Sequence, residues 1–234
     1  MSQEKIATRT TLLDSAAVAD SIKREVARDV AAFVSRHNVQ PCLAAVRVGD
    51  DAASEVYVRN KIRACEAVGI RSEHHALPAT IGAASLLELI SSLNAREDVD
   101  GILVQLPLPG DIDDSKIIEA IDPAKDVDGF HPVSIGRLSL GRPTFVPCTP
   151  AGIVELLERN DIPIAGARAC VVGRSQIVGR PMTQLLLQRD ATVTICHSRT
   201  RDLASVTREA DLLVVAIGRA GLIGREHIKP RPHT

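Results

Sequence analysis

The spacing of the apolar residues along the chain alternates between that of a helix and that of a buried strand. Apolar side chains recur every three or four positions from Val18 to Phe33, and Asp14 precedes them, so a helix capped by this aspartate is expected. The apolar run from Pro41 to Val48 is typical of a buried strand. The same patterns continue: further helices are expected at residues 52–68, 83–94, 115–121, 151–160, 179–189 and 202–210, and further strands at residues 71–77, 101–106, 169–172, 192–196 and 212–217.

This alternation predicts an α/β fold with parallel sheets, because consecutive parallel strands need a crossover between them, usually a helix. From Asp122 to Pro150, repeated prolines interrupt the periodicity, so no long helix or strand is expected there. We therefore predict two domains, residues 1–149 and 150–234, with their boundary near Thr149.

Composition narrows the possible partners. The chain has 234 residues and a formal net charge of -1, so it has no excess of positive charge to bind phosphates. With three Phe, one Tyr and no Trp, it also has few aromatic rings for base stacking. No nucleic acid partner is therefore expected. The five cysteines lack metal-site spacing, which favours a reduced, cytoplasmic protein without a bound metal. The longest apolar run, Leu212 to Ile217, is far shorter than the ~20 residues of a membrane-spanning helix, so no membrane partner is expected.

A glycine-containing loop opens the second half of the chain, between a predicted strand and a predicted helix. Gly173, Arg174, Ser175 and Gly179 lie in it, and a helix that begins after such a loop offers free N–H groups to a phosphate. The spacing is not G-x-G-x-x-G, however. A turn that needs glycine only for its backbone angles is the alternative interpretation.

The end of the next predicted strand favours NADP over NAD. NAD-binding folds usually carry an acid there for the ribose 2′-hydroxyl, but this chain has Ser198 and Arg199. Together with Arg174, these residues suit the 2′-phosphate of NADP, because arginine binds phosphate through paired donors. A solvated basic face is the alternative. The adjacent Cys196 and His197 are expected on opposite faces of the strand, which argues against a nucleophilic pair.

In the first half, Tyr57 and Lys61 are four residues apart on a predicted helix and share one face. Alone, such a pair is most often a solvated face. It is also the Y-x-x-x-K pattern of short-chain dehydrogenases, but there the nucleotide loop precedes the pattern, whereas here it follows.

Two polar segments follow in the same half. Gln105 lies near the carboxyl end of a predicted strand, where α/β folds bind their ligands. Asp126 and Asp128 lie in a loop bounded by Pro123 and Gly129, where aspartates usually form turns. The two carboxylates alone supply too few oxygens for a Ca²⁺ site.

Five motifs follow one another along the chain. They are Tyr57-Val58-Arg59-Asn60-Lys61, Val104-Gln105-Leu106-Pro107, Lys125-Asp126-Val127-Asp128-Gly129, Pro147-Cys148-Thr149-Pro150, and Val172-Gly173-Arg174-Ser175 with Val178-Gly179-Arg180-Pro181. Taken together, they resemble the methylenetetrahydrofolate dehydrogenase/cyclohydrolase family from about Leu12 to Pro230. The resemblance implies an N-terminal folate-binding catalytic α/β domain, a Rossmann-like NADP-binding domain, and a folate substrate in the cleft between them.

The resemblance also implies two reactions of one-carbon metabolism, which supplies purine biosynthesis. Methylenetetrahydrofolate is oxidised by NADP⁺, and the methenyl product is hydrolysed to 10-formyltetrahydrofolate. Lys61 would handle protons, Gln105 would hold its amine, Tyr57 would pack on the folate and Asp128 would accept pterin N–H bonds. Val104 and Leu106 would line the substrate site, and a homodimer is implied. The cofactor would contact Gly173, Arg174, Ser175, Gly179, Ser198, Arg199 and Gly218.

The C-terminus departs from the family. Members continue beyond the position of Pro230 with a core strand, a Pro-Gly-Gly-Val-Gly-Pro-Met-Thr loop and a helix that returns to the first domain. Arg231-Pro232-His233-Thr234 does not resemble this continuation, so we expect a truncated member with an incomplete NADP-binding domain. Two alternatives stay open: a non-catalytic NADP-binding or dimerising remnant, and an unrelated NADP-dependent dehydrogenase that uses Tyr57 and Lys61.

Overall fold

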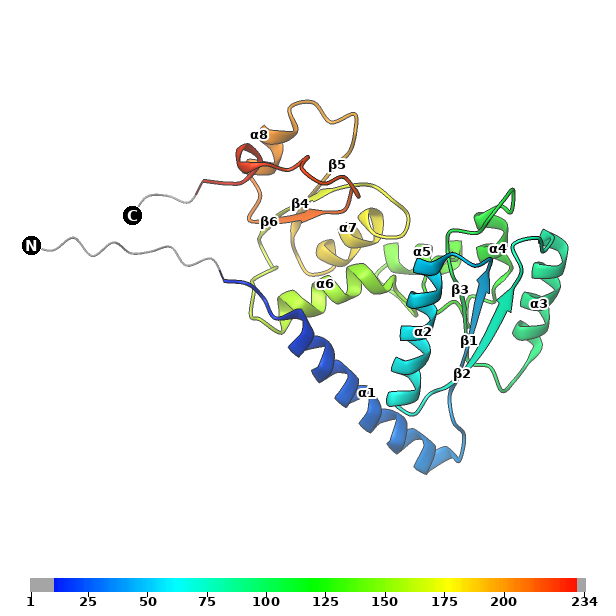
Figure 1. Cartoon of the computed structure of the whole chain (residues 1–234). Coiled ribbons are helices and arrows are strands. Elements are labelled where there is room, and N and C mark those ends of the chain that lie inside the picture. The colour runs from blue at the N-terminus through cyan, green and yellow to red at the C-terminus, as the bar shows by residue number, and fades with distance from the viewer. Residues whose placement is uncertain (1–10, 231–234) are drawn as a thin grey trace, which may run out of the picture.

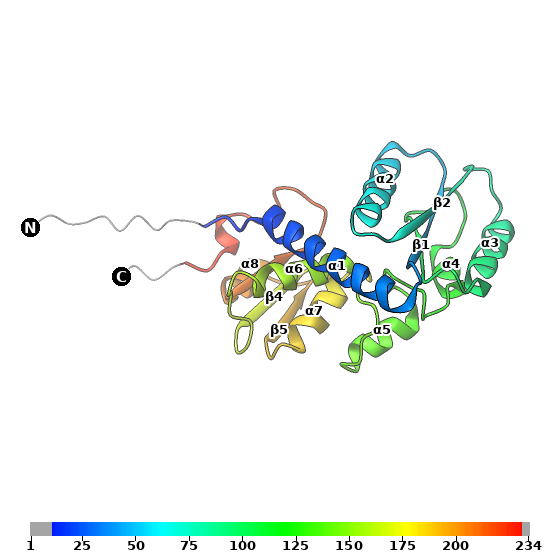
Figure 2. The ribbon, with the colours of Figure 1, turned by 90° about the horizontal axis from the view of Figure 1, so that it is seen from below.

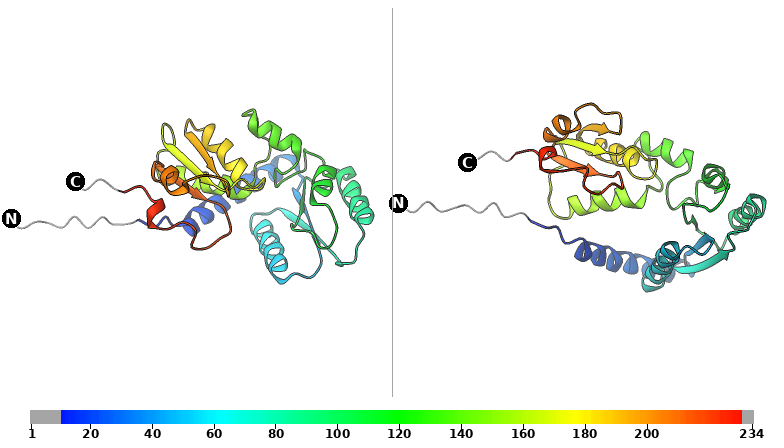
Figure 3. Two further views of the ribbon diagram at one scale, coloured as in Figure 1. Left: turned by 90° about the horizontal axis from the view of Figure 1, so that it is seen from above. Right: turned by 45° about the horizontal axis from the view of Figure 1, so that its top comes forward.

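The computed structural model of the chain describes residues 11–230, and for residues 52–54 the backbone alone. It has two lobes, each built around a three-stranded parallel sheet (Figures 1 and 3). The prediction of an α/β fold with parallel sheets is confirmed. Residues 231–234, on which the expectation of a truncated C-terminus rests, lie outside the described residues.

The first lobe has the strand order β2-β1-β3, with α2 on one face of the sheet and α3 and α4 on the other (Figure 2). Alternate residues of β1, from Cys42 to Val48, pack on Leu86, Ile90 and Leu93 of α3, which explains the apolar run in the sequence. The elements are α1 (Ser15–His37), β1 (Cys42–Val48), α2 (Ala52–Ala67), β2 (Arg71–Leu77), α3 (Ala83–Ala95), β3 (Gly101–Val104) and α4 (Asp114–Ala120).

The second lobe has the strand order β5-β4-β6. The central strand β4 is buried on both faces: Val171 packs with Met182 and Leu186 of α7, and Val172 lies in a separate cluster that α8 covers. The elements are α5 (Pro132–Ser139), α6 (Cys148–Glu158), β4 (Arg168–Val172), α7 (Gly179–Leu187), β5 (Thr192–Cys196), α8 (Leu203–Arg208), β6 (Leu212–Val215) and the short 3₁₀ helix η1 (Arg225–His227). Among residues 11–230, no helix is long and apolar enough to cross a membrane.

Helix α1 joins the two lobes. It begins at the predicted cap, where Asp14 Oδ1 accepts the Ala17 N–H at 3.0 Å, and it runs along α6 before it reaches the first sheet (Figures 1 and 2). The guanidinium of Arg159, the residue after α6, donates to both carboxylate oxygens of Glu25 on α1 at 2.7 Å, and this pairing lowers the pKa of Glu25 to about 2. Because the pair is exposed to solvent, we expect it to orient the lobes more than it stabilises them.

The proline-rich segment contains a short helix that the sequence pattern did not indicate. Pro132 occupies the first turn of α5, where its missing N–H has no cost, and His131 Nδ1 accepts the Val133 N–H at 3.0 Å. Leu138 of α5 packs in the core of the second lobe. Helix α6 begins at Cys148, three residues earlier than expected, so Thr149 lies in its first turn.

Candidate functional site

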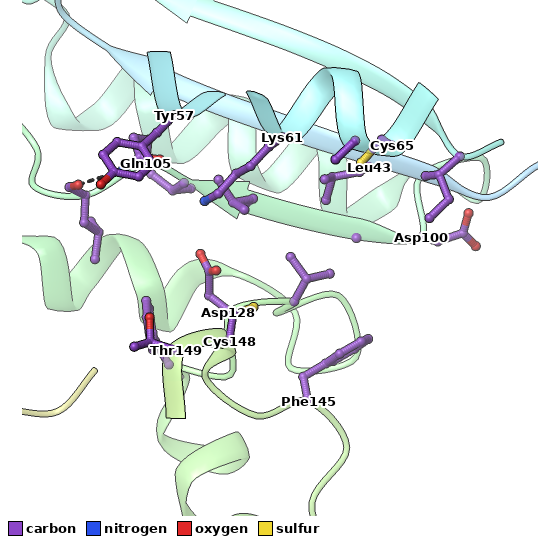
Figure 4. Close-up of a pocket in the computed structure, with 18 of the residues that line it drawn as sticks. Leu43, Tyr57, Lys61, Cys65, Asp100, Gln105, Asp128, Phe145, Cys148 and Thr149 are labelled. Atoms are coloured by element: carbon purple, nitrogen blue, oxygen red, sulfur yellow. Dashed lines mark hydrogen bonds between the residues drawn. The ribbon is translucent and has the colours of Figure 1, made fainter. Parts of the chain in front are cut away.

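A cavity of about 830 Å³ lies between the two lobes, within the size range of small-molecule sites. Its walls come from α2 and β3 of the first lobe, from the loop around Asp128, and from the start of α6 and the loop before α7 (Figure 4). The lining residues are mostly apolar: Pro41, Cys42, Leu43, Tyr57, Lys61, Ala64, Cys65, Ile70, Asp100, Gly101, Leu103, Val104, Gln105, Leu106, Val127, Asp128, Phe130, Phe145, Cys148, Thr149, Ile177 and Val178.

The cavity brings together the residues predicted to act on the substrate. Tyr57 and Lys61 are one turn apart on α2, and Lys61 reaches towards Asp128 on the opposite wall (Figure 4). Gln105 follows the last residue of β3, beside Val104 and Leu106, which also line the cavity. Tyr57 is 64% exposed and therefore lies at the rim.

The two aspartates of the predicted pair have different surroundings. Asp126 is 2% exposed and accepts three hydrogen bonds, from the Phe130 N–H at 3.3 Å, the His131 N–H at 2.8 Å and the Ser134 hydroxyl at 2.8 Å. It therefore forms the turn into α5, as the alternative interpretation had it. Asp128 lines the cavity instead. Within the described part of the chain, no group of three or more His, Cys, Asp or Glu side chains could hold a metal ion.

The environment of Asp128 makes its carboxyl harder to ionise than that of an exposed aspartate. Burial raises the pKa of this carboxyl above its usual range; the Lys61 charge opposes the increase, and the Asp126 charge adds to it. A carboxyl in such surroundings changes its charge closer to neutral pH than an exposed aspartate does.

One of the two polar atoms of the Gln105 side chain has a hydrogen-bond partner in the described structure and the other has none. Its Nε2 donates to the carbonyl oxygen of Leu106 at 2.9 Å, while its buried Oε1 has no partner among the groups that the structure describes. Burying an acceptor without a hydrogen bond costs free energy, so we expect a donor to reach this oxygen when a ligand is bound.

Replacing Asp126 by Ala is expected to lower the free energy of unfolding by about 2 kcal/mol or more, because three donors around the turn lose their acceptor. Chemical denaturation measures this change. The exposed Asp111→Ala variant is the matched control, with an expected change within about 0.5 kcal/mol. A loss no larger than that of the control would show that the turn does not depend on Asp126.

Sequence reasoning missed several residues of the site. Phe145 and Ile177 gave no signal, because an apolar side chain in a loop has no periodicity from which to infer its position. Cys148 and Thr149 belong to a motif of the family, and Pro147 before them marks a helix start, so their place on the cavity wall could have been proposed. Lys125 of the neighbouring motif caps α3: its ammonium donates to the carbonyl oxygens of Leu93, Asn94 and Arg96 at 3.2, 2.8 and 2.6 Å.

The predicted cofactor residues follow β4, β5 and β6, whose carboxyl ends lie at one edge of the sheet. Gly173 has a φ of +127°, and a Cβ there would lie 2.3 Å from the carbonyl oxygen of Ala216. A Cβ on Gly179 would lie 2.1 Å from the carbonyl oxygen of Gly173. Both glycines are therefore required by the chain's own packing, with or without a ligand.

The polar residues at this edge of the sheet differ in whether their side chains bond to the backbone or are exposed to solvent. Ser175 Oγ accepts the N–H groups of Val178 and Gly179, both at 3.2 Å, and so shapes the start of α7. Arg174, Ser198 and Arg199 are exposed. Gly218, in the loop after β6, has a φ of +60°.

Two family models match this chain, and the residues that they match divide it as the two lobes do. The family model of the tetrahydrofolate dehydrogenase/cyclohydrolase catalytic domain matches residues 13–128, and the model of the NAD(P)-binding domain of the same enzymes matches residues 147–233. The chain belongs to the tetrahydrofolate dehydrogenase/cyclohydrolase family. The alternative of an unrelated Tyr-x-x-x-Lys dehydrogenase is therefore wrong.

Relatives in this family match nearly the whole chain. A bifunctional protein FolD of Koribacter versatilis is 55% identical over 220 residues, which are 94% of this chain and 71% of that protein. The crystal structure of the bifunctional FolD methylenetetrahydrofolate dehydrogenase/cyclohydrolase of Campylobacter jejuni has a TM-score of 0.90 at 45% identity, over 93% of this chain and 77% of that one. The FolD structure of Trypanosoma brucei, complexed with NADP cofactor and inhibitor, has a TM-score of 0.89 at 38% identity, over 94% and 76% of the two chains.

Proposed function

We propose that this chain oxidises 5,10-methylenetetrahydrofolate with NADP⁺ and hydrolyses the resulting 5,10-methenyltetrahydrofolate to 10-formyltetrahydrofolate. The observation that carries the proposal is the cavity between the lobes, where Lys61, Gln105 and Asp128 converge in a member of this family. The cavity is large and mostly apolar, with a few polar groups, as expected of a site for a flat heterocycle.

Four polar residues of the cavity have roles in the proposed reactions. Asp128 as a carboxylate accepts two N–H groups of the pterin, and Tyr57 packs on the substrate at the rim. The unpaired Gln105 Oε1 accepts a hydrogen bond from the Lys61 ammonium and holds it beside the one-carbon unit. Lys61 then moves the proton that hydrolysis requires.

The second lobe fits NADP. Helix α7 begins directly after the loop that Gly173 opens, and the positive end of its dipole favours a pyrophosphate there. Arg174, Ser198 and Arg199 would hold the 2′-phosphate, with Ser175 and Gly218 shaping the loops around the cofactor. When bound, NADP⁺ supplies the hydride acceptor.

Folate binding is expected to weaken as the pH falls through the raised pKa of Asp128. Only the carboxylate accepts both pterin N–H groups, so affinity should drop by up to roughly tenfold per pH unit below that pKa. The drop should begin at a higher pH than for an ordinary aspartate, and titration calorimetry across pH measures it. Asp128→Asn should bind weakly and without this pH dependence; an unchanged profile in that variant would contradict the role of Asp128.

Three further proposals concern the whole protein. The domain boundary lies near Thr149, at the start of α6; the separate hydrophobic cores support two domains, although α5 before this boundary packs Leu138 in the second core. The chain forms a homodimer through its second domain, where β5 and β6 are edge strands of the described sheet. The protein works in the cytoplasm, which is supported by five free cysteines. Light scattering measures the oligomeric state.

The function is tested on the purified chain by two absorbance assays. One follows NADPH formation from methylenetetrahydrofolate and NADP⁺, and the other follows the loss of the methenyl chromophore. Activity in both is expected. NADP binding without either activity would instead identify the non-catalytic remnant.

A further inference from the structure

The loop between β5 and α8 carries two of the three residues proposed to hold the 2′-phosphate (Figure 1). It runs from His197 to Asp202, and within it the exposed Ser198 and Arg199 lie between two half-buried residues, His197 and Thr200. The conformation of this short turn decides where the Ser198 hydroxyl and the Arg199 guanidinium point.

Three hydrogen bonds hold the turn, and each involves His197. The imidazole Nδ1 accepts the Arg199 N–H at 3.1 Å, the His197 N–H donates to Thr200 Oγ1 at 2.8 Å, and the His197 carbonyl oxygen accepts the Thr200 N–H at 2.8 Å. The first bond requires an unprotonated Nδ1. His197 Nδ1 and Thr200 Oγ1 are thus both bonded within the turn.

We propose that His197 is a positioning residue for NADP, whose imidazole fixes the turn so that Ser198 and Arg199 face the 2′-phosphate. The inference rests on the proposed function, because it presumes that these two residues bind NADP. The proposal gives the residues of this loop two roles. Ser198 and Arg199 contact the cofactor, and the His197 imidazole holds the backbone that carries them.

Asparagine offers a conservative replacement. Its side-chain oxygen accepts the N–H two residues further on in an Asx turn, which is the bond that His197 Nδ1 makes to Arg199. The His197→Asn variant should therefore keep the turn, whereas His197→Ala should lose it. His37→Ala, at an exposed position on α1, is the matched control.

Titration calorimetry with NADP and with NAD, and hydrogen exchange of the Arg199 amide by NMR, test the proposal. His197→Ala should raise the Kd for NADP roughly two- to tenfold, which corresponds to one lost hydrogen bond, and leave that for NAD unchanged. The Arg199 amide should exchange faster in this variant. His197→Asn and His37→Ala should resemble the wild type in all three measurements.

Other outcomes overturn the inference. If His197→Asn bound NADP as poorly as His197→Ala, the imidazole would act on the cofactor itself. Equal losses of NAD and NADP affinity in His197→Ala would show that His197 does not act through the 2′-phosphate. An unchanged exchange rate of the Arg199 amide would show that the turn does not depend on this bond. A wild-type chain that binds neither cofactor would refute the proposed function, whereas a selective wild type with unaltered selectivity in His197→Ala would refute the inference alone.

Discussion

Replacing Lys61 by Met should reduce the cyclohydrolase activity by roughly 10²- to 10⁴-fold, the usual contribution of a general acid or base. Attack of water on the methenyl carbon requires a proton to move, and Lys61 is the proposed group that moves it. Hydride transfer between two bound rings depends mainly on their orientation, so the dehydrogenase activity should fall much less. Methionine keeps an unbranched side chain in the cavity and removes the charge.

The two absorbance assays, run on the same preparation, measure both losses. Lys116→Met, at an exposed position on α4, is the matched control and should retain both activities. Equal losses of the two activities in the Lys61 variant would contradict the proton-handling role. They would indicate instead that Lys61 only holds the substrate.

Replacing Arg174 by Ala should weaken NADP binding by roughly ten- to a hundredfold and leave NAD binding nearly unchanged. The guanidinium is exposed at the carboxyl end of β4, and a charge-assisted contact to the 2′-phosphate is worth about 1.5–3 kcal/mol. NAD lacks this phosphate, so the contact does not exist in its complex.

Titration calorimetry with each cofactor gives both dissociation constants. Arg137→Ala, which removes an exposed arginine of α5, should change neither. A wild-type chain that binds NAD as tightly as NADP would contradict the assignment of the 2′-phosphate site, and so would an Arg174 variant that loses both cofactors equally.

The sequence was sufficient to predict most of the fold, because the signals are local. Asp14 caps α1 as predicted, and the bounds of β2 and β5 are those expected. Helix α5 was missed because prolines dominate its segment, although Pro132 is well suited to a helix start. Strand β3 ends at Val104, two residues early, so Gln105 lies just beyond the strand rather than within it.

The site was harder to predict, because it depends on which neighbours a side chain meets. Asp126 and Asp128 are two residues apart in one loop, and no local pattern tells which of them is buried. Only the fold places Ser134 and the N–H of His131 against Asp126 and leaves Asp128 for the cavity. The resemblance to the family named Asp128 for binding, but it gave no reason why its neighbour should differ.

The loop before α7 shows a related limit. The glycines at 173 and 179 suggested a phosphate-binding loop, yet the structure requires them for contacts within the chain. Backbone approach to Ala216 could not be foreseen, because β6 lies about forty residues further along the sequence. A glycine pattern alone therefore does not separate a packing requirement from a ligand site.

The most direct measurement is a crystal structure of the chain with a tetrahydrofolate analogue and NADP⁺. We predict that the pteridine occupies the cavity between α2 and α6, with two of its N–H groups within about 3 Å of the Asp128 carboxylate. Lys61 Nζ should lie beside the one-carbon position and donate to Gln105 Oε1. A pteridine bound elsewhere, for example in another cavity of about 530 Å³ that α4, α5 and α7 line, would contradict the assignment of the folate site.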